Sequence, residues 1–146
     1  MFKILFICTA NIYRSRFSEE VYNHLAMKNN LPTRAFSAGL QVGLYKTRKI
    51  YKPALQELDR LKIVPIRAEE NSIHVDDIDF RNYNMIICMD EEEHRPMVEL
   101  NSNVKKQNII YWNIVDEPLA SCNISLPKCY EKIQELINKV SADHNI

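Results

Sequence analysis

The chain is 146 residues long, with 46% hydrophobic and 26% charged residues and a formal net charge of +0 at pH 7. These values are typical of a globular protein, so we expect residues 1–146 to form a single domain with a substantial core. A chain without net charge has no long-range electrostatic attraction for nucleic acid or an anionic membrane. No stretch approaches the roughly 20 apolar residues of a membrane span.

The counts of glycine and cysteine narrow the function classes further. With only 2 glycines, the chain lacks the glycine-rich loops that hold nucleotides, so we expect no nucleotide cofactor. The 4 cysteines and 4 histidines do not have the spacing of a metal site, so we expect no zinc. The apolar run at the N-terminus is too short for a signal peptide, and we expect a cytoplasmic, reduced protein.

The first predicted strand leads through a short loop into the first predicted helix. Residues 2–7 form a nearly continuous apolar run, which is typical of a strand buried on both faces of a parallel sheet. Apolar residues then recur every four positions, which predicts a helix with one buried face over residues 15–30. The loop between them begins at Cys8, and a loop that precedes a helix N-terminus is suited to binding an anion.

The residue types in this loop indicate chemistry. Cys8 should ionise readily beside Arg14 and the helix N-terminus, because both stabilise a thiolate. The planar fork of Arg14 can hold two phosphate oxygens, and Ser15 can donate its hydroxyl to the sulfur. Alternatively, Cys8 is an inert core cysteine and Arg14 a surface charge. The position of Cys-x5-Arg-Ser between a strand and a helix favours the chemical interpretation.

The rest of the chain alternates strands and helices. We expect strands over residues 33–37, 83–90 and 108–112, one helical turn over residues 75–80, and helices that begin near residues 53, 91 and 126. This alternation predicts an α/β fold with a four-stranded, parallel, doubly wound sheet and helices on both faces. Ligands bind such sheets at the carboxyl ends of the strands, so the loops at Cys8 and Asp116 should share one edge.

Four side chains outside this loop have simpler interpretations. Cys88 and Cys129 lie within apolar patterns, which predicts two buried core thiols, whereas Cys122 should be exposed. His94 falls in the third predicted helix, where a single histidine is typically solvated or caps the helix rather than acting as a base.

The segment Ile4-Leu-Phe-Ile-Cys-Thr-Ala-Asn-Ile-Tyr-Arg-Ser15 resembles the phosphate loop of the low-molecular-weight protein tyrosine phosphatases. The signature of that family is an apolar strand followed by Cys-x-x-Asn-x-x-Arg-Ser. Ser-Ala-Gly at residues 37–39 and Met-Asp at residues 89–90 also fit its pattern, so the resemblance covers nearly the whole chain. It implies a phosphotyrosine phosphatase I-like fold.

The resemblance also implies a phosphate monoester hydrolase that forms a phosphocysteine on Cys8. Asn11 would brace the loop, and it tolerates the left-handed conformation that a loop without glycine requires. Backbone N–H groups and Arg14 would bind the phosphate oxygens. The expected phosphate-binding residues are Thr9, Ala10, Asn11, Ile12, Tyr13, Arg14 and Ser15. The substrate would be a phosphorylated protein or a small phosphate ester.

A general acid is expected in the loop after the fourth strand, where the family carries Asp-Pro. Here the order is Asp116-Glu117-Pro118, one residue longer. Asp116 keeps the family's distance from the strand and is the preferred acid, with Glu117 as the alternative.

Several positions depart from the family pattern. Ala10, Tyr13 and Arg16 stand where a glycine, a second cysteine and a proline are common. The aromatic residues that follow the acid in eukaryotic members are replaced by Leu-Ala-Ser at residues 119–121, which leaves phosphotyrosine open as the natural substrate. In the family the region after the second strand forms a wall of the substrate crevice, and Leu44 and Tyr45 are its candidates here.

Two other functions remain as alternatives. Some arsenate reductases share the loop and pass a disulfide through two further cysteines seven residues apart. Cys122 and Cys129 have that spacing, but they fall in the acid loop and the last helix rather than after the third strand. A phosphocysteine carrier or phospho-ligand binding protein would need no acid, and Asp116 argues against it.

Overall fold

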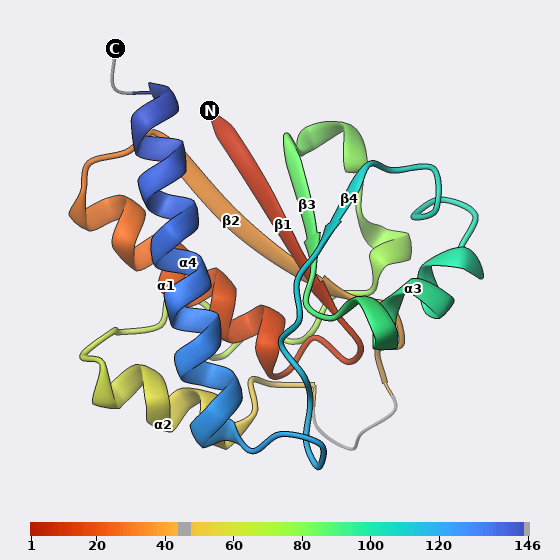
Figure 1. Ribbon diagram of the computed structural model, residues 1–146, viewed down its shortest axis with the longest axis horizontal. Helices are drawn as coiled ribbons and strands as arrows, with labels where there is room; N and C mark the ends of the chain where they lie inside the picture. Colours follow the sequence, from red (N-terminus) through yellow and green to blue (C-terminus); the bar gives the residue numbers. More distant parts are fainter. Residues whose placement is uncertain (44–47, 145–146) are drawn as a thin grey trace.

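A computed structural model describes residues 1–43 and 48–144, and a four-stranded parallel sheet forms its centre (Figure 1). The strands are β1 Phe2–Cys8, β2 Thr33–Gly39, β3 Met85–Cys88 and β4 Ile109–Tyr111, in the spatial order β2-β1-β3-β4. The chain leaves β1 toward β2 on one side and later crosses to β3 on the other. The predicted α/β fold is therefore confirmed, and the strand order reverses at the carboxyl end of β1.

Helices cover both faces of the sheet (Figure 1). Three of them pack on one face, namely α1 Arg14–Lys28, α2 Lys52–Arg60 and α4 Cys122–His144. The other face is covered by α3 Glu91–Glu99 and two 3₁₀ turns, Val75–Asp77 and Phe80–Asn82. None of the helices in the described ranges combines the length and the apolar character needed to cross a membrane.

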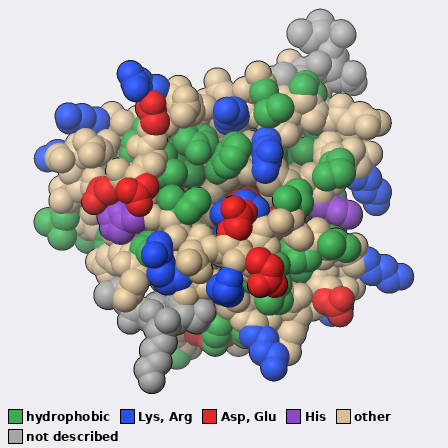
Figure 2. All heavy atoms as spheres, turned by 180° about the vertical axis from the view of Figure 1, so that it is seen from behind, with side chains coloured by type: hydrophobic (Ala, Val, Ile, Leu, Met, Phe, Trp, Pro, Cys, Tyr) green, Lys and Arg blue, Asp and Glu red, His purple; other side chains and the backbone are tan. Residues whose placement is uncertain are grey.

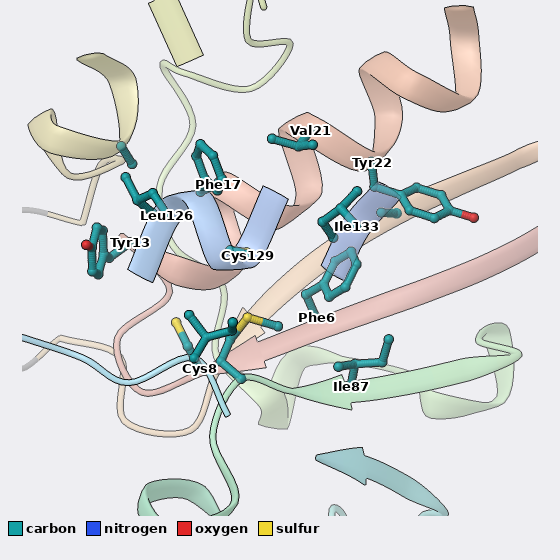
Figure 3. Close-up of a cluster of buried hydrophobic side chains, with 14 of the residues drawn as sticks. Phe6, Cys8, Tyr13, Phe17, Val21, Tyr22, Ile87, Leu126, Cys129 and Ile133 are labelled. Atoms are coloured by element: carbon teal, nitrogen blue, oxygen red, sulfur yellow. The ribbon is translucent and has the colours of Figure 1, made fainter. Parts of the chain in front are cut away.

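The two hydrophobic cores explain the apolar run of β1. Ile4 and Phe6 face the layer of α1 and α4, whereas Leu5 and Ile7 face the opposite side, and all four are fully buried. Figure 3 shows Phe6 directed toward Tyr22 of α1. Each such side chain stabilises the fold by roughly 1.5–3 kcal/mol, so β1 is fixed from both faces.

The prediction that α1 buries one face is wrong over residues 14–23, which are all buried, while the last turn is exposed at Met27 and Lys28. Its polar residues Glu19 and Glu20 are buried. Glu20 accepts hydrogen bonds from the backbone N–H groups of Ile66 and Arg67, and Glu19 forms an ion pair with Arg67. The segment around residues 66–70 therefore covers the face that the pattern assigned to solvent.

Two other boundaries differ from expectation. The last helix begins at Cys122 rather than near residue 126, and Pro127 lies inside it. The N–H groups of Ile124 and Ser125 bond to the Ser121 carbonyl, so the helix starts before the proline that suggested its first turn. The single turn expected over residues 75–80 forms two separate 3₁₀ turns.

Acidic and basic side chains are intermingled over the face of the molecule seen in Figure 2. This distribution fits a chain whose 19 basic and 19 acidic residues balance.

Candidate functional site

A pocket of about 370 Å³ opens at the carboxyl end of β1, where the strand order reverses. The loop after β1, the start of α2 and the loop before α4 contribute to it. Its lining residues are Cys8, Thr9, Ala10, Ile12, Tyr13, Arg14, Tyr51, Asp116 and Glu117.

The sulfur of Cys8 sits at the base of the loop with two donors near it. The Asn11 backbone N–H donates to Cys8 Sγ over 3.3 Å, and the Ser15 hydroxyl oxygen lies 2.9 Å from the same sulfur. Because the Asn11 amide already donates to the Ser15 oxygen, the Ser15 proton is free to point at the sulfur. Both contacts place a polar hydrogen-bonding group against the sulfur.

Asn11 holds the loop in shape, as its side chain joins three separate segments. Its Nδ2 donates to Ser15 Oγ over 2.8 Å and to Ser37 Oγ over 2.9 Å, and its Oδ1 accepts from the Ile73 backbone N–H over 2.9 Å. Its φ of 57° is the left-handed conformation expected in this loop. The amide bonds fix a backbone shape that most residues avoid.

Gly39 lets the end of β2 approach this loop closely. A Cβ atom added there would lie 2.7 Å from the Thr9 carbonyl oxygen and 3.0 Å from the Asn11 Cβ. Any side chain would therefore push the phosphate loop outward, which gives a physical reason for glycine at the end of Ser-Ala-Gly.

Arg14 is buried, and three of its five N–H donors form hydrogen bonds in the site. Nη1 donates to Glu93 Oε1 over 3.0 Å and to the Ile114 carbonyl over 2.9 Å. Nη2 donates to Glu93 Oε2 over 2.8 Å and lies 3.3 Å from Asp116 Oδ2. The buried Nε has no partner among the described residues, which costs roughly 1–3 kcal/mol unless an acceptor arrives. The Nε–Nη2 edge therefore remains available to an anion.

The structure brings Asp116 beside Arg14 and directs Glu117 elsewhere. Asp116 accepts a hydrogen bond from the backbone N–H of Glu117 over 2.8 Å, in addition to its contact with Arg14. The Glu117 carboxylate contacts the Tyr51 hydroxyl at 3.4 Å, and its charge raises the pKa of Tyr51. Both carboxylates line the pocket, but of the two it is Asp116 that lies within ion-pair distance of Arg14.

Tyr13 forms part of the pocket wall together with Tyr51. The two rings meet edge to face, with centroids 5.4 Å apart. Burial, with the charge of Glu117 acting in the same direction, raises the pKa of the Tyr13 hydroxyl. Aromatic surface thus lines this pocket although it is missing from residues 119–121.

Sequence reasoning missed Glu93 and gave His94 the wrong environment. His94 is fully buried rather than solvated, and its Nε2 lies 3.1 Å from both Thr9 Oγ1 and Glu93 Oε2. Burial alone would raise the pKa of the Glu93 carboxyl, but hydrogen bonds from His94 and Arg14 hold it well below its usual range. The sequence carried one indication of their role: Glu93 and His94 follow β3 closely, and the carboxyl end of β3 lies at the same sheet edge as Cys8.

The other cysteines are not among the residues that line this pocket. Cys88 and Cys129 are fully buried, and burial raises the pKa of each thiol to about 12. Cys122 is half-buried at the start of α4 rather than exposed. The candidate wall residues Leu44 and Tyr45 lie outside the described residues.

Together these contacts place a thiol, an arginine with an unpartnered Nε and a carboxylate in one pocket. Such a set can attack a phosphorus atom, bind its charged oxygens and move a proton. In residues 1–43 and 48–144 no group of three or more His, Cys, Asp or Glu side chains is arranged to hold a metal ion.

Solved structures with the same fold carry different activities. YfkJ from Bacillus subtilis has a TM-score of 0.83 at 20% identity, covering 99% of this chain and 97% of that one. The YwlE arginine phosphatase from the same organism has a TM-score of 0.76 at 14% identity, covering 99% of each chain. An arsenate reductase from Archaeoglobus fulgidus has a TM-score of 0.70 at 20% identity, covering 92% and 98%. Identities this low show the fold alone.

A family comparison covers nearly the whole chain. No curated protein matches this chain. The family model described as low molecular weight phosphotyrosine protein phosphatase matches residues 3–143, which span the loop at Cys8, the loop at Asp116 and every strand and helix between them. The chain therefore belongs to the low molecular weight phosphotyrosine protein phosphatase family.

Proposed function

We propose that the protein is a cysteine-dependent phosphate monoester hydrolase of the protein tyrosine phosphatase type, with residues 1–146 acting as one phosphatase domain. The observation that carries the proposal is the unpartnered Nε of Arg14 in a pocket that also holds Cys8. A buried donor without an acceptor, in a pocket with a thiol that makes hydrogen bonds to Asn11 and Ser15, suits a phosphate group more than a neutral ligand.

In the first step the Cys8 thiolate attacks phosphorus in line with the ester oxygen. The sulfur–phosphorus bond forms, the phosphorus–oxygen bond to the leaving group breaks, and Asp116 gives its proton to that oxygen. Loop N–H groups and the Nε–Nη2 edge of Arg14 bind the equatorial oxygens, where transition-state charge is spread. The product alcohol or phenol leaves, and a phosphocysteine remains.

In the second step water attacks the phosphocysteine. Asp116 takes a proton from the water, the phosphorus–sulfur bond breaks, and Cys8 returns to the thiolate as inorganic phosphate departs. The scheme needs no cofactor, metal or second cysteine. A phosphorylated protein or a small phosphate ester supplies the substrate, and we propose the reducing cytoplasm as its location.

The contacts in the pocket support Asp116 over Glu117 as the acid. Asp116 lies 3.3 Å from the Arg14 Nη2 that would hold a phosphate oxygen, whereas Glu117 contacts Tyr51 on the pocket wall. The general acid must reach the leaving oxygen of the same phosphate, so the carboxylate nearer to Arg14 is better placed.

The two alternative functions fit the site less well. An arsenate reductase must pass a disulfide through two further thiols, but Cys88 and Cys129 are fully buried and their raised pKa disfavours the reactive thiolate. A phosphocysteine carrier has no use for a carboxylate beside the anion-binding arginine.

The test is hydrolysis of p-nitrophenyl phosphate by the wild type and by Cys8→Ser, with release of both p-nitrophenol and phosphate measured. We expect turnover by the wild type and none by Cys8→Ser, which should still bind vanadate because its loop and Arg14 are unchanged. Residual turnover above a few per cent of wild type would remove Cys8 from the mechanism. Thioredoxin-coupled arsenate turnover without phosphate release would favour the reductase instead.

A further inference from the structure

We infer that Glu93 is a positioning residue that fixes the guanidinium of Arg14 so that its Nε–Nη2 edge faces the phosphate. This inference rests on the proposed function and assigns a role to a residue that the phosphatase signature does not contain. Glu93 lies in the first turn of α3, 79 residues from Arg14 in the sequence.

The contact between the two side chains is bidentate. Nη1 and Nη2 of Arg14 donate to the two carboxylate oxygens of Glu93 over 3.0 and 2.8 Å. A planar fork on a planar carboxylate fixes the guanidinium in rotation as well as in position. With its end occupied by Glu93 and the second Nη1 proton on the Ile114 carbonyl, the guanidinium can present only its Nε–Nη2 edge to a ligand.

Glu93 is itself held by two side chains. The Thr9 hydroxyl donates to Glu93 Oε2, and His94 Nε2 lies 3.1 Å from the same oxygen. The Asp90 backbone N–H donates to His94 Nδ1 over 3.1 Å, so the histidine carries its proton on Nε2 and directs it toward Glu93 and Thr9. Because Thr9 belongs to the phosphate loop, these contacts join the loop, α3 and Arg14.

The start of α3 supplies the remaining support. Asp90 caps this helix, and its Oδ2 accepts from the Glu93 backbone N–H over 3.1 Å. A carboxylate in the first helical turn is favoured by the helix dipole. Glu93 is therefore fixed at both its backbone and its side chain.

The negative charge of Glu93 distinguishes a role in orienting Arg14 from a role in attracting phosphate. An ionised carboxylate this close to Arg14 opposes the binding of a phosphate dianion. Its benefit must come from orientation, so removing its charge should harm turnover more than anion affinity. A residue that only attracted phosphate, or only stabilised the fold, would not produce this division.

The kinetic test compares wild type, Glu93→Gln and the matched control Glu92→Gln, which changes an exposed glutamate on the same helix. We expect kcat on p-nitrophenyl phosphate to fall by about 10²-fold in Glu93→Gln, as for a misplaced catalytic group. Inhibition by inorganic phosphate should stay near the wild-type value or tighten, and Glu92→Gln should behave as wild type. An unchanged kcat in Glu93→Gln, or an equal loss in both variants, would overturn the inference.

A double variant shows whether Glu93 acts through Arg14. Lysine keeps the positive charge of Arg14 but has no fork for a carboxylate to orient. In an Arg14→Lys background, Glu93→Gln should therefore add little further loss. If the two losses multiply, Glu93 acts independently of Arg14 and the inference fails.

A spectroscopic measurement tests positioning without relying on activity. The Nε–H of Arg14 should give an NMR signal that is sharp in wild type and Glu92→Gln, absent in Arg14→Lys, and broadened in Glu93→Gln. Thermal unfolding of each variant shows whether it is folded. If the wild type hydrolyses no phosphate ester, the proposed function fails while this signal still reports on Glu93. A sharp, unshifted signal in folded Glu93→Gln would refute the positioning role.

Discussion

Two arginines at the start of α1, Arg14 and Arg16, are equally buried but serve different regions of the molecule. Each is 1% exposed. Arg14 is bound by carboxylates from two other segments, whereas Arg16 Nη2 donates to the backbone carbonyls of Arg67 and Glu70 over 2.7 and 3.1 Å. Each also keeps one side-chain nitrogen without a partner among the described residues, Nε in Arg14 and Nη1 in Arg16, but of the two only Arg14 lines the pocket. Burial of an arginine does not by itself mark a candidate site; an unpartnered donor in a pocket that also holds a cysteine does.

The charge environments of the two arginines differ in the same way. Burial lowers the pKa of Arg16, and the nearby positive charge of Arg67 acts in the same direction. Burial would also lower the pKa of Arg14, but the hydrogen bonds to Glu93 hold it above the ordinary value. Arg14 is thus held as a cation ready for an anion, while Arg16 ties α1 to the segment that covers it.

The cluster around Arg16 nevertheless reaches the phosphate loop. Glu19 pairs with Arg67 and accepts a hydrogen bond from the Ser37 hydroxyl, and Ser37 in turn accepts from the Asn11 amide. Asn11 holds the left-handed turn of the loop. The cluster around Arg16 therefore supports the phosphate loop. Substitutions at Arg14 and at Arg16 should still differ in whether they affect catalysis or stability.

The largest expected effect is the loss of turnover on substitution of Asp116, whose carboxylate lies beside Arg14 Nη2. Asp116→Asn should lower kcat by about 10²–10⁴-fold, because an amide cannot give a proton to the leaving oxygen. Aryl phosphates with poor leaving groups should lose most, and activated esters least, in a series of substituted phenyl phosphates. Glu117→Gln is the matched control. An equal loss across the series, or a larger loss in Glu117→Gln, would contradict the assignment of Asp116.

A smaller effect, on stability instead of catalysis, is expected at the other arginine. Arg16→Met leaves the Arg67 and Glu70 carbonyls without their donor, which should lower the free energy of unfolding in urea by about 1–3 kcal/mol. The kcat of the folded protein should stay near wild type, whereas Arg14→Lys should lower the kcat of the folded protein. The comparison breaks if Arg16→Met inactivates the enzyme without destabilising it.

The two regions also differ in how much of their structure can be predicted from the sequence. The apolar run of β1 and the change of period at α1 predict the strand, loop and helix that surround Cys8, because these are local patterns. Parallel strands share one carboxyl edge, so the meeting of the Cys8 and Asp116 loops follows from topology alone. Asn11 in the left-handed conformation follows from a loop without glycine.

What the sequence does not reveal depends on distant partners. Glu19 looks like a solvent-facing residue of α1 because its partner Arg67 comes 48 residues later. Glu93 and His94 stand among charged residues that look like an exposed helix start, and only the packing of α3 against the phosphate loop makes them part of the site. Pro127 suggested a helix start because proline favours the first turn, but backbone bonds to Ser121 begin α4 earlier.

The smallest expected effect is a pair of opposite pH dependences of stability, one in each region. Hydrogen bonds depress the pKa of Glu93 below its ordinary value of 4.5, so this residue stabilises the fold above that pH, and the contribution is lost as the pH falls. Burial raises the pKa of Glu20 above 4.5, so its contribution is fully present below that pH and is lost as the pH rises through the folded-state pKa. Urea unfolding at pH values from 4 to 7 measures both. Wild type should lose unfolding free energy as the pH falls, and Glu93→Gln should make this loss smaller. The Glu20 contribution partly offsets the loss, because it grows as the pH falls. Glu20→Gln should therefore make the loss of unfolding free energy on acidification larger. If both variants shift the profile in the same direction, the two buried glutamates do not differ in the way their surroundings indicate.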